Sequence, residues 1–377
     1  MDITAKKLNL LNKEEYILID IRDQSDWAYG VIPSAFTVKP DLILSQNLDK
    51  SKKIIVYCAK GVLSDQVAEQ LRLNGYDAYN LAGGYFQWLR EEMSKQISAD
   101  YAKQVELSIT KRFRISLLSR FVKAIKEYQL INDGDKIAVC MSGGKDSFLM
   151  AKLFQEYHKY SKENFDLKFV VMDPGYNEQN RNIIEENAAR LNIPIEIFNS
   201  NIFESVYNVE KSPCYLCARM RRGHLYNYAK QLGCNKIALG HHYDDVIETI
   251  LMGMLYGAQI QTMMPKLKST NFNGMELIRP LYLIREDDIK AWRDANDLHF
   301  IQCACLFTDT CTSCRDDGRS YSKRQATKEL IRTLKEQSPD VEKCIFRSVE
   351  NVNLDTVIAY KSHGVTHNFL DEYDEKN

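Results

Sequence analysis

The sequence lacks any apolar run of the roughly 18 residues that a membrane-spanning helix needs. It also lacks an excess of charge of one sign, since 50 Lys and Arg against 51 Asp and Glu leave a net charge of -1. The net charge therefore gives no sign of a nucleic-acid partner. A local basic surface remains compatible with the sequence, because the clustering of basic residues matters more for nucleic-acid binding than the net charge. The start of the chain, with Lys13, Glu14 and Glu15, lacks the apolar region of a secretory signal. We therefore predict a cytoplasmic protein with no membrane partner.

Ten cysteines occur in this chain of 377 residues, whose 45% hydrophobic and 27% charged residues are typical of a globular protein with two or three domains. Disulfides are disfavoured in a reducing compartment, so metal binding, cluster binding or thiol chemistry becomes the expected use of these cysteines. Their placement supports this expectation, because Cys214 and Cys217 lie close together and Cys303, Cys305, Cys311 and Cys314 share one short stretch.

Two short apolar runs near the start of the chain, 16–20 and 53–57, end in polar turns as buried parallel strands do. Helical spacing of apolar residues follows within 63–73 and 84–95. This alternation predicts a small α/β domain.

A second α/β pattern follows, and its alternation predicts a doubly wound parallel sheet with ligands at the carboxyl ends of the strands. Its strands are predicted near 136–141, 168–172, 194–198 and 236–240. Its helices are predicted near 145–159, 177–191, 215–232 and 242–256. The predicted division of the chain is a first α/β domain at 1–97, a linker helix at 98–130, the doubly wound domain at 131–337 and a tail at 338–377.

The predicted linker helix has a basic face. It is formed by Lys111, Arg112, Arg114, Arg120, Lys123 and Lys126. Two interpretations stay open: a solvated helix face, and a surface that contacts a phosphate backbone.

The predicted strand at 136–141 runs directly into the hexapeptide Ser142-Gly143-Gly144-Lys145-Asp146-Ser147 and then into a helix. The glycines let the backbone approach anionic oxygens, the serines supply hydroxyl donors, and the helix N-terminus adds partial positive charge. Its spacing differs from the Walker pattern. The hexapeptide resembles the loop of the PP-loop ATP pyrophosphatase superfamily, which implies that it binds the pyrophosphate of ATP and that a substrate is adenylated.

Two further segments fall at predicted strand ends. Met172 and Asp173 end one strand, where backbone groups are placed to read the adenine edge. Gly240 ends a later strand and is followed shortly by Asp244 and Asp245, which would face the triphosphate. Paired carboxylates beside phosphates predict a hard cation, Mg²⁺.

Cys214 and Cys217 open a predicted helix and are followed by an arginine-rich stretch. Two thiols in a helix-opening turn can hold one metal, but a Cys-x-x-Cys pair alone leaves a redox pair, a zinc site and an iron–sulfur site open. With the Gly240 segment and the distant Cys303, the pattern resembles the tRNA 2-thiocytidine synthetase family over residues 110–335. The resemblance implies a [4Fe–4S] cluster held by Cys214, Cys217 and Cys303, with one iron free to carry sulfide.

The later cysteines leave this ligand set open. Both Cys303 and Cys305 fit as the third cluster ligand, and we favour Cys303. Cys311 and Cys314 either form an additional Zn²⁺ site with Cys305 and a fourth ligand, or are spare thiols on a loop.

Cys58 directly follows a predicted strand and precedes a helix, so a loop wrapped around it can aim N–H groups at the sulfur and lower the thiol pKa. Its surroundings, which include Asp20-Ile-Arg22 and Leu81-Ala-Gly-Gly84, resemble a rhodanese domain over residues 10–95. The resemblance implies that Cys58 accepts sulfane sulfur from an upstream persulfide donor such as a cysteine desulfurase. Tethering then raises the concentration of this donor near the acceptor.

These resemblances predict an ATP-dependent tRNA sulfurtransferase in which Cys58, Cys214 and Cys303 are catalytic. It would adenylate a pyrimidine carbonyl of tRNA, that of cytidine by resemblance, and replace the oxygen with sulfur to give 2-thiocytidine. A homodimer is one candidate assembly. One alternative is a thiolase that acts on a tRNA uridine or a small molecule, and another is a sulfur carrier or cluster scaffold regulated by ATP. An amide-forming ligase is disfavoured because it would need neither Cys58 nor a cluster.

Overall fold

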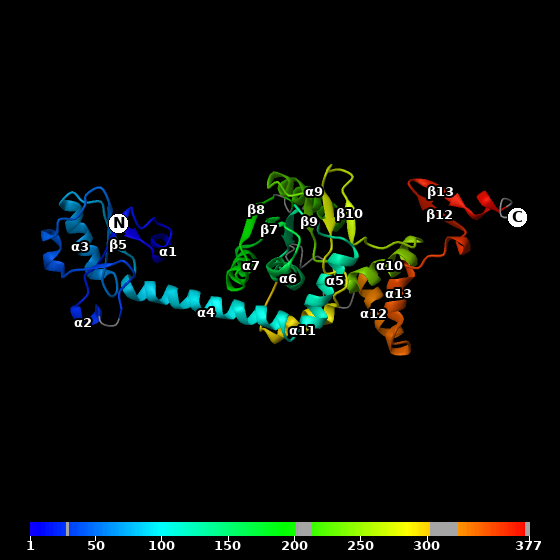
Figure 1. Ribbon diagram of the computed structural model, residues 1–377, viewed down its shortest axis with the longest axis horizontal. Coiled ribbons are helices and arrows are strands. Elements are labelled where there is room, and N and C mark those ends of the chain that lie inside the picture. Colours follow the sequence, from blue (N-terminus) through cyan, green and yellow to red (C-terminus); the bar gives the residue numbers. More distant parts are fainter. Residues whose placement is uncertain (28–29, 201, 203–212, 302–322, 374–377) are drawn as a thin grey trace. The chain divides into compact units, whose positions relative to one another are not determined.

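The computed structural model of the protein describes residues 1–27, 30–200, 202, 213–301 and 323–373 (Figure 1). The chain forms two compact units, Met1–Tyr101 and Ala102–Asn377. Their boundary falls close to the domain boundary predicted between 97 and 98. None of the helices in the described part of the chain is long and apolar enough to cross a membrane.

The first unit contains a five-stranded sheet in the order β1-β5-β4-β2-β3, and all of its strand pairs are parallel. The two predicted strands are β2 and β4, which are neighbours in this sheet. The other three strands are shorter and lack a long apolar run, so their sequence did not reveal them. The strands are β1 Asp2–Ile3, β2 Tyr16–Asp20, β3 Phe36–Thr37, β4 Lys53–Tyr57 and β5 Ala78–Leu81.

Both faces of this first sheet are buried. Alternate residues of β4 point to opposite faces, so Ile54 and Val56 join one apolar cluster while Ile55 and Tyr57 join another. The helical segments of the unit are α1 Ala5–Leu8, α2 Gln24–Trp27, η1 Pro40–Ser45, α3 Val62–Leu73 and the first part of α4 Gly84–Thr110. This burial on two sides explains why the central strands are continuous apolar runs.

The segment predicted as one linker helix, 98–130, contains three elements. The second part of α4 occupies its start, and a π-helical turn, η2 (Arg114–Leu118), separates it from α5 (Ser119–Glu127). Phe121, Ala124 and Ile125 of α5 are buried. The apolar spacing continues through the break, so periodicity alone could not reveal where one helix stops.

The second unit contains a six-stranded sheet in the order β10-β11-β9-β6-β7-β8. Its strands are parallel except β10, which is antiparallel to β11 at one edge and thus departs from the predicted parallel sheet. The short connection between β10 and β11 allows only an antiparallel return. The strands are β6 Lys136–Met141, β7 Asp166–Asp173, β8 Ile195–Asn199, β9 Lys236–Ala238, β10 Lys266–Lys268 and β11 Glu276–Ile278.

The strand order changes direction at β6. The chain proceeds from β6 to β7 and β8 on one side and then returns to place β9 on the other side of β6. Ligands of open α/β sheets bind at such a point, beyond the carboxyl ends of the two diverging strands. The segments that follow β6 and β9 are the predicted loop at 142–147 and the segment that begins at Gly240.

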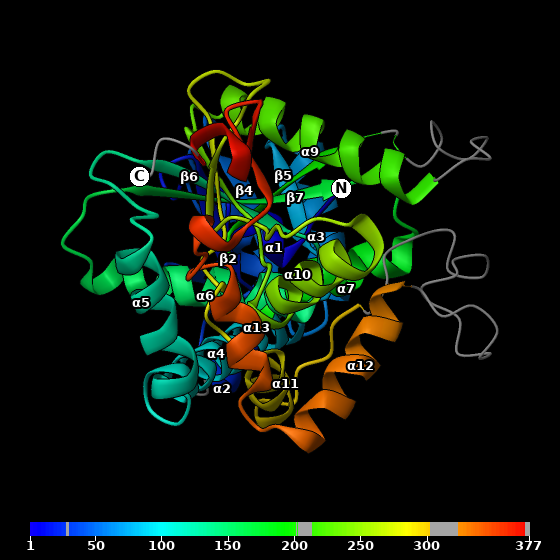
Figure 2. The same cartoon turned by 90° about the vertical axis from the view of Figure 1, so that its right-hand side faces the viewer.

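Helices cover this sheet, and three of them pack against one another. Figure 2 shows α10, α12 and α13 side by side, and buried side chains from all three, Val246, Ile250, Ile331 and Phe346, form one apolar cluster. The predicted tail therefore begins with a helix that belongs to the second unit. The helices are α6 Lys145–Tyr160, α7 Glu178–Arg190, α9 Pro213–Gln231, α10 Tyr243–Gly257, α11 Glu286–Ala295, α12 Lys323–Gln337 and α13 Val341–Ser348. A hairpin follows, with β12 Ala359–Ser362 and β13 Val365–Asn368, between the turns η3 Leu354–Thr356 and η4 Phe369–Glu372.

Candidate active site

The hexapeptide 142–147 makes a tight connection between β6 and α6. Gly143 has a φ of +86°, a left-handed conformation that favours glycine, and Gly144 is the N-cap of α6. Ser147 Oγ donates a hydrogen bond to the Gly144 carbonyl oxygen at 2.8 Å, and Ser142 Oγ lies 3.5 Å from Ser147 Oγ. The N-terminus of α6 therefore opens at this loop, where its N–H groups and partial positive charge favour an anion.

A cavity of about 300 Å³ lies beside the loop, at the carboxyl ends of β6, β7 and β9. The predicted residues that line it are Ser142, Asp146, Ser147, Met172, Gly240 and Asp245. Apolar side chains of Met141, Met172, Leu225 and Leu239 line it as well. The cavity thus combines surface for a flat apolar ring with polar groups for phosphates.

Asp146 has one carboxylate oxygen without a hydrogen bond. Its Oδ2 accepts from Lys145 Nζ at 3.1 Å. Its Oδ1 is buried and has no hydrogen-bond partner within the described residues, and His242 Nε2 lies 3.9 Å away. A buried charged oxygen without a partner is costly. A bound cation or donor is therefore expected at this oxygen.

Asp245 is fixed at the cavity by a reciprocal cap of α10. Its backbone N–H donates to His242 Nδ1 at 3.4 Å, and its Oδ2 accepts from the backbone N–H of His242 at 3.1 Å. Its Oδ1 lies 3.5 Å from the guanidinium of Arg324.

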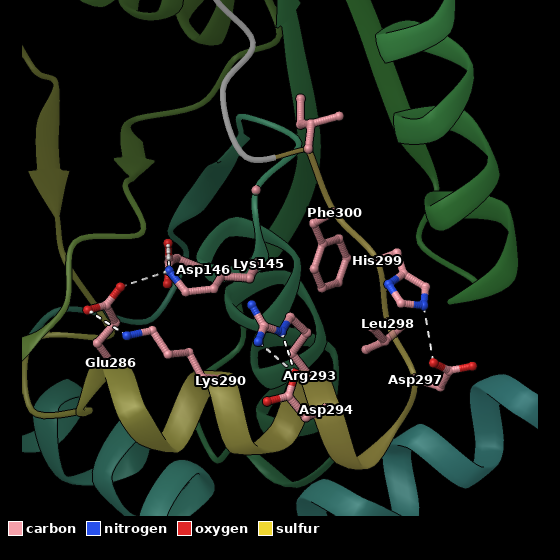
Figure 3. A pocket seen from close by; sticks show the side chains of 12 residues that line it. Lys145, Asp146, Glu286, Lys290, Arg293, Asp294, Asp297, Leu298, His299 and Phe300 are labelled. Atoms are coloured by element: carbon pink, nitrogen blue, oxygen red, sulfur yellow. Dashed lines mark hydrogen bonds and ion pairs between the residues drawn. The ribbon is translucent and has the colours of Figure 1, made fainter. Parts of the chain in front are cut away.

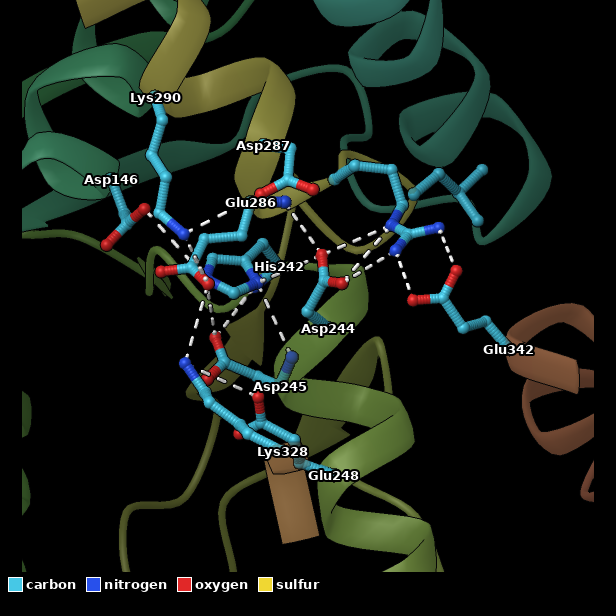
Figure 4. Close-up of polar contacts among 12 residues, drawn as sticks. Asp146, His242, Asp244, Asp245, Glu248, Glu286, Asp287, Lys290, Lys328 and Glu342 are labelled. Atoms are coloured by element: carbon cyan, nitrogen blue, oxygen red, sulfur yellow. Dashed lines mark hydrogen bonds and ion pairs between the residues drawn. The ribbon is translucent and has the colours of Figure 1, made fainter. Parts of the chain in front are cut away.

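Asp244 points to a different set of partners (Figure 4). Its Oδ1 accepts from Arg285 Nη2 at 3.0 Å, and its Oδ2 accepts from the backbone N–H of Glu286 at 2.7 Å. Arg285 also contacts Glu342 Oε1 at 2.7 Å. Burial lowers the pKa of Arg285, but its hydrogen bonds to Glu342 and Asp244 outweigh burial and raise the pKa overall. Asp244 therefore ties α10 to α11 and α13, and it does not line the 300 Å³ cavity.

A second cavity, of about 690 Å³, is lined by Gly144, Lys145 and Asp146 of the loop and by residues of α11 (Figure 3). Lys145 lines it and forms ion pairs with Asp146 at 3.1 Å and with Glu286 at 3.3 Å. Burial raises the pKa of Glu286, but the ammonium groups of Lys328, Lys145 and Lys290 outweigh it and lower the pKa to about 2. Glu286 is therefore ionised at neutral pH and fixes the Lys145 side chain of the loop through their ion pair.

Asp173, predicted at the adenine edge, shapes a turn. Its Oδ1 accepts from the backbone N–H groups of Gly175 at 2.8 Å and Tyr176 at 2.7 Å. Its Oδ2 lies 3.3 Å from Arg181. This turn brings Tyr176 to the lining of the 300 Å³ cavity, next to Met172.

The predicted cluster ligands are only partly within the described structure. Cys214 and Cys217 lie in the first turn of α9. Cys303, Cys305, Cys311 and Cys314 lie outside the described residues. Within the described part of the chain, no group of three or more His, Cys, Asp or Glu side chains is arranged to hold a metal ion.

Cys58 lies in the first unit, at the end of β4 and before α3. Its Sγ accepts from the backbone N–H of Gly61 at 3.2 Å and from Ser64 Oγ at 3.3 Å. Burial alone would raise the pKa of the Cys58 thiol, but hydrogen bonds from Ser64, Lys60 and Gly61 outweigh it and lower the pKa. The thiolate, which is the nucleophile, is therefore favoured.

Replacing Ser64 with alanine should raise the pKa of the Cys58 thiol, because the thiolate loses a hydroxyl donor. Less thiolate is then present at neutral pH, so the pH profile of Cys58 alkylation shifts to higher pH and the rate at pH 7 falls. Alkylation followed by mass spectrometry measures this rate. Ser45→Ala is a matched control, since Ser45 Oγ donates to the Leu42 carbonyl oxygen and has no contact with Cys58 among the described residues. An unchanged profile in Ser64→Ala would contradict the role of Ser64.

The sequence did not single out several polar residues of these sites. His241 and His242 lie between Gly240 and Asp244 but had no predicted role, and no local pattern marked Arg279, Arg285 and Glu286. They join the site through contacts between segments far apart in the sequence. Asn80 was missed in the same way, although its Oδ1 lies 2.7 Å from Ser64 Oγ and shares the single hydroxyl hydrogen with Cys58 Sγ.

Comparisons with known proteins give a consistent result. A family model described as a PP-loop domain matches residues 116–305, and one described as a rhodanese-like domain matches residues 4–91.

The "tRNA-cytidine(32) 2-sulfurtransferase" of Cellvibrio japonicus (strain Ueda107) is 36% identical over 235 residues, which cover 61% of this chain and 73% of that protein. The protein of the same name from Aliivibrio fischeri (strain MJ11) is 37% identical over 235 residues, 61% of this chain and 72% of that protein. Among solved structures, the U34-tRNA thiolase NcsA from Methanococcus maripaludis with its [4Fe-4S] cluster matches with a TM-score of 0.48 and 22% identity, over 62% of this chain and 76% of that chain.

Proposed function

Because the chain belongs to the family of the tRNA-cytidine(32) 2-sulfurtransferases and contains both a PP-loop domain and a rhodanese-like domain, we propose that it converts a cytidine of tRNA to 2-thiocytidine. The chain is an ATP-dependent tRNA sulfurtransferase.

The observation that carries the proposal is the 300 Å³ cavity beside the loop at 142–147. ATP would place its adenine ring against Met141, Met172 and Leu239 and its phosphates against the loop and the N-terminus of α6. The buried, unpaired Oδ1 of Asp146 lies at the same place, which supports the presence of a positively charged or donating group when ATP is bound.

The proposed reaction has two steps. In the first, O2 of the cytidine attacks the α-phosphorus of ATP, an oxygen–phosphorus bond forms, and pyrophosphate leaves with the electron pair of the broken bond. In the second, hydrosulfide adds to C2, its proton is lost to solvent, and AMP leaves with the electron pair of the carbon–oxygen bond. Adenylation is needed because a carbonyl oxygen is a poor leaving group. The sum is cytidine, ATP and hydrosulfide going to 2-thiocytidine, AMP and pyrophosphate.

The polar part of this site suits Mg²⁺, which prefers carboxylate oxygens. We propose that Asp146 and Asp245 would hold it, since both line the cavity and Asp146 has an unpaired oxygen. Of the predicted pair Asp244 and Asp245, Asp244 would act by fixing the start of α10 through Arg285. When bound, Mg²⁺ neutralises phosphate charge as pyrophosphate leaves.

We further propose that Cys214, Cys217 and Cys303 hold a [4Fe–4S] cluster. The first turn of α9 supplies two of these cysteines, and a set of thiolates is the donor set that such clusters take. When bound, the cluster would supply an iron free to carry sulfide.

Cys58 would receive the sulfur first. A persulfide donor would transfer sulfane sulfur to the Cys58 thiolate, which gives a Cys58 persulfide and leaves the donor as a thiolate. Release of this sulfur as hydrosulfide takes two electrons. A dithiol supplies them as it is oxidised to a disulfide, and Cys58 returns to the thiolate. The lowered pKa of Cys58 supports this role.

The test combines two measurements. Cells that lack the protein should lose 2-thiocytidine from their tRNA nucleosides, as measured by mass spectrometry, and wild-type protein should restore it. The purified protein should release pyrophosphate from ATP only when unmodified tRNA is present. Asp245→Asn should fail to restore the modified base, whereas Lys361→Gln, an exposed change in β12, should restore it. Retention of 2-thiocytidine in the deletion strain would indicate that the substrate is a uridine or a small molecule. Absence of pyrophosphate release would favour a sulfur carrier regulated by ATP.

A further inference from the structure

His241 lies directly beside the phosphate-binding loop. It follows Gly240, which packs so closely on the start of α6 that a Cβ atom there would lie 3.4 Å from both the Asp146 carbonyl carbon and the Ser147 nitrogen. The His241 side chain lines the 300 Å³ cavity together with Ser142, Asp146 and Asp245. A group on this ring can therefore reach a molecule bound at the loop.

Arg279 fixes the state of this ring. Its side chain is almost buried, with 9% of the residue exposed, and its Nε donates to His241 Nδ1 at 3.3 Å. Its Nη1 also donates to the carbonyl oxygen of Met264, which anchors the guanidinium. A guanidinium only donates, so Nδ1 of His241 must be the unprotonated acceptor and the single proton of the neutral ring must lie on Nε2.

The surroundings keep the His241 ring neutral. Burial and the charge of Arg279 lower the pKa of His241, Asp245 opposes them, and the result is a pKa of about 4. Among the described residues, the hydrogen bond of the His241 ring is the one that Nδ1 accepts from Arg279, so the N–H group at Nε2 is not engaged by it. The neutral ring thus presents an N–H donor at the 300 Å³ cavity beside the loop.

Building on the proposed function, we propose that His241 is a catalytic residue for adenylation, whose Nε2–H donates to a phosphoryl oxygen of ATP, and that Arg279 is the positioning residue that fixes this tautomer. Negative charge on the oxygens of the α-phosphorus increases as the cytidine oxygen attacks and pyrophosphate leaves. A donor already aimed at that oxygen stabilises the transition state more than the bound substrate. Its loss should therefore lower kcat and leave the KM for ATP nearly unchanged.

Two substitutions of His241 distinguish its two nitrogens. In His241→Gln the amide nitrogen falls near the position of Nε2, whereas in His241→Asn it falls near Nδ1. We expect tRNA-dependent pyrophosphate release to fall about 100-fold in kcat for His241→Asn, the size of a lost oxyanion donor, and by less than about tenfold for His241→Gln. His158→Asn is the matched control and should keep wild-type activity, because the His158 Nε2 atom lies 2.9 Å from the Phe165 carbonyl oxygen, away from this cavity. Equal losses in the Asn and Gln variants would overturn the proposal.

The role of Arg279 is tested through His241. Arg279→Met should lower kcat in the wild-type background but cause little further loss in the His241→Gln background, where no tautomer remains to be fixed. Additive losses in the double variant would overturn the positioning role. Thermal unfolding of each variant separates an effect on folding from an effect on kcat. A wild-type protein that releases no pyrophosphate would instead contradict the proposed function itself, so the two failures can be told apart.

Discussion

Replacing Cys58 with serine should abolish tRNA thiolation supported by a persulfide donor, with a loss on the order of 10⁴-fold, as expected when a nucleophile is removed. A serine hydroxyl cannot hold sulfane sulfur, and it is a far weaker acid than the Cys58 thiol, whose pKa the surrounding hydrogen bonds lower. The loop around Cys58 supplies hydrogen bonds to a sulfur anion from Gly61 and Ser64. Removing the sulfur therefore removes the anion that these donors stabilise.

The same variant should keep most of its activity with inorganic sulfide, because the proposed adenylation site lies in the second unit and would not need Cys58. Measuring 2-thiocytidine formation with each sulfur source separates the two roles. Cys344→Ser is a matched control, since Cys344 is an exposed free thiol and its loss should leave both activities unchanged. Equal losses of Cys58→Ser with both sulfur sources would contradict a relay role for Cys58.

Replacing Gly84 with alanine should be nearly as damaging to persulfide-supported thiolation, with a loss of about 100-fold, because it displaces the Cys58 loop. A Cβ atom at Gly84 would lie 2.7 Å from the Gly61 nitrogen and 2.9 Å from the Ala59 carbonyl carbon, and it would lie closer still to the Cys58 carbonyl oxygen. All three atoms are backbone atoms of the Cys58 loop, so the loop itself must move. That movement withdraws the N–H group of Gly61 from Cys58 Sγ and raises the pKa of the thiol.

Gly75→Ala is the matched control for Gly84→Ala. Gly75 has a φ of +80° and Gly84 a φ of +60°, so alanine pays a similar conformational cost of about 1–2 kcal/mol at both. At Gly75, however, the added Cβ would meet only Lys50 Nζ, at 3.6 Å. Alkylation rates and persulfide-supported thiolation should fall in Gly84→Ala and stay near wild type in Gly75→Ala. Similar behaviour of both variants would show that steric contact with the loop is unimportant.

Local patterns in the sequence revealed the elements on which both sites are built. The strands at 16–20, 53–57 and 136–141 were predicted with the bounds that the structure has, because each is a buried apolar run followed by a sharp turn. The loop at 142–147 was visible because glycine and hydroxyl residues between a strand and a helix are a local arrangement. The placement of Cys58 directly after a strand was visible for the same reason.

Elements without such a local signal were missed or misjudged. The strand β10 is short and polar, and its antiparallel direction depends on pairing with β11. The break between α4 and α5 is a change in hydrogen bonding that the continuing apolar spacing conceals. The attachment of α13 to α10 depends on packing of side chains such as Phe346, which sequence spacing does not show.

The sequence by itself determined the two α/β units, the loop at 142–147 and the cysteine at the end of β4, because short-range patterns specify these features. Only the tertiary structure decided how the two adjacent carboxylates divide their contacts, with Asp245 at the cavity and Asp244 bound to Arg285. It alone placed Arg279 on His241 and Gly84 against the Cys58 loop. The physical reason is that these contacts join segments that the sheet topology brings together, and no spacing along the chain encodes which side chains then meet.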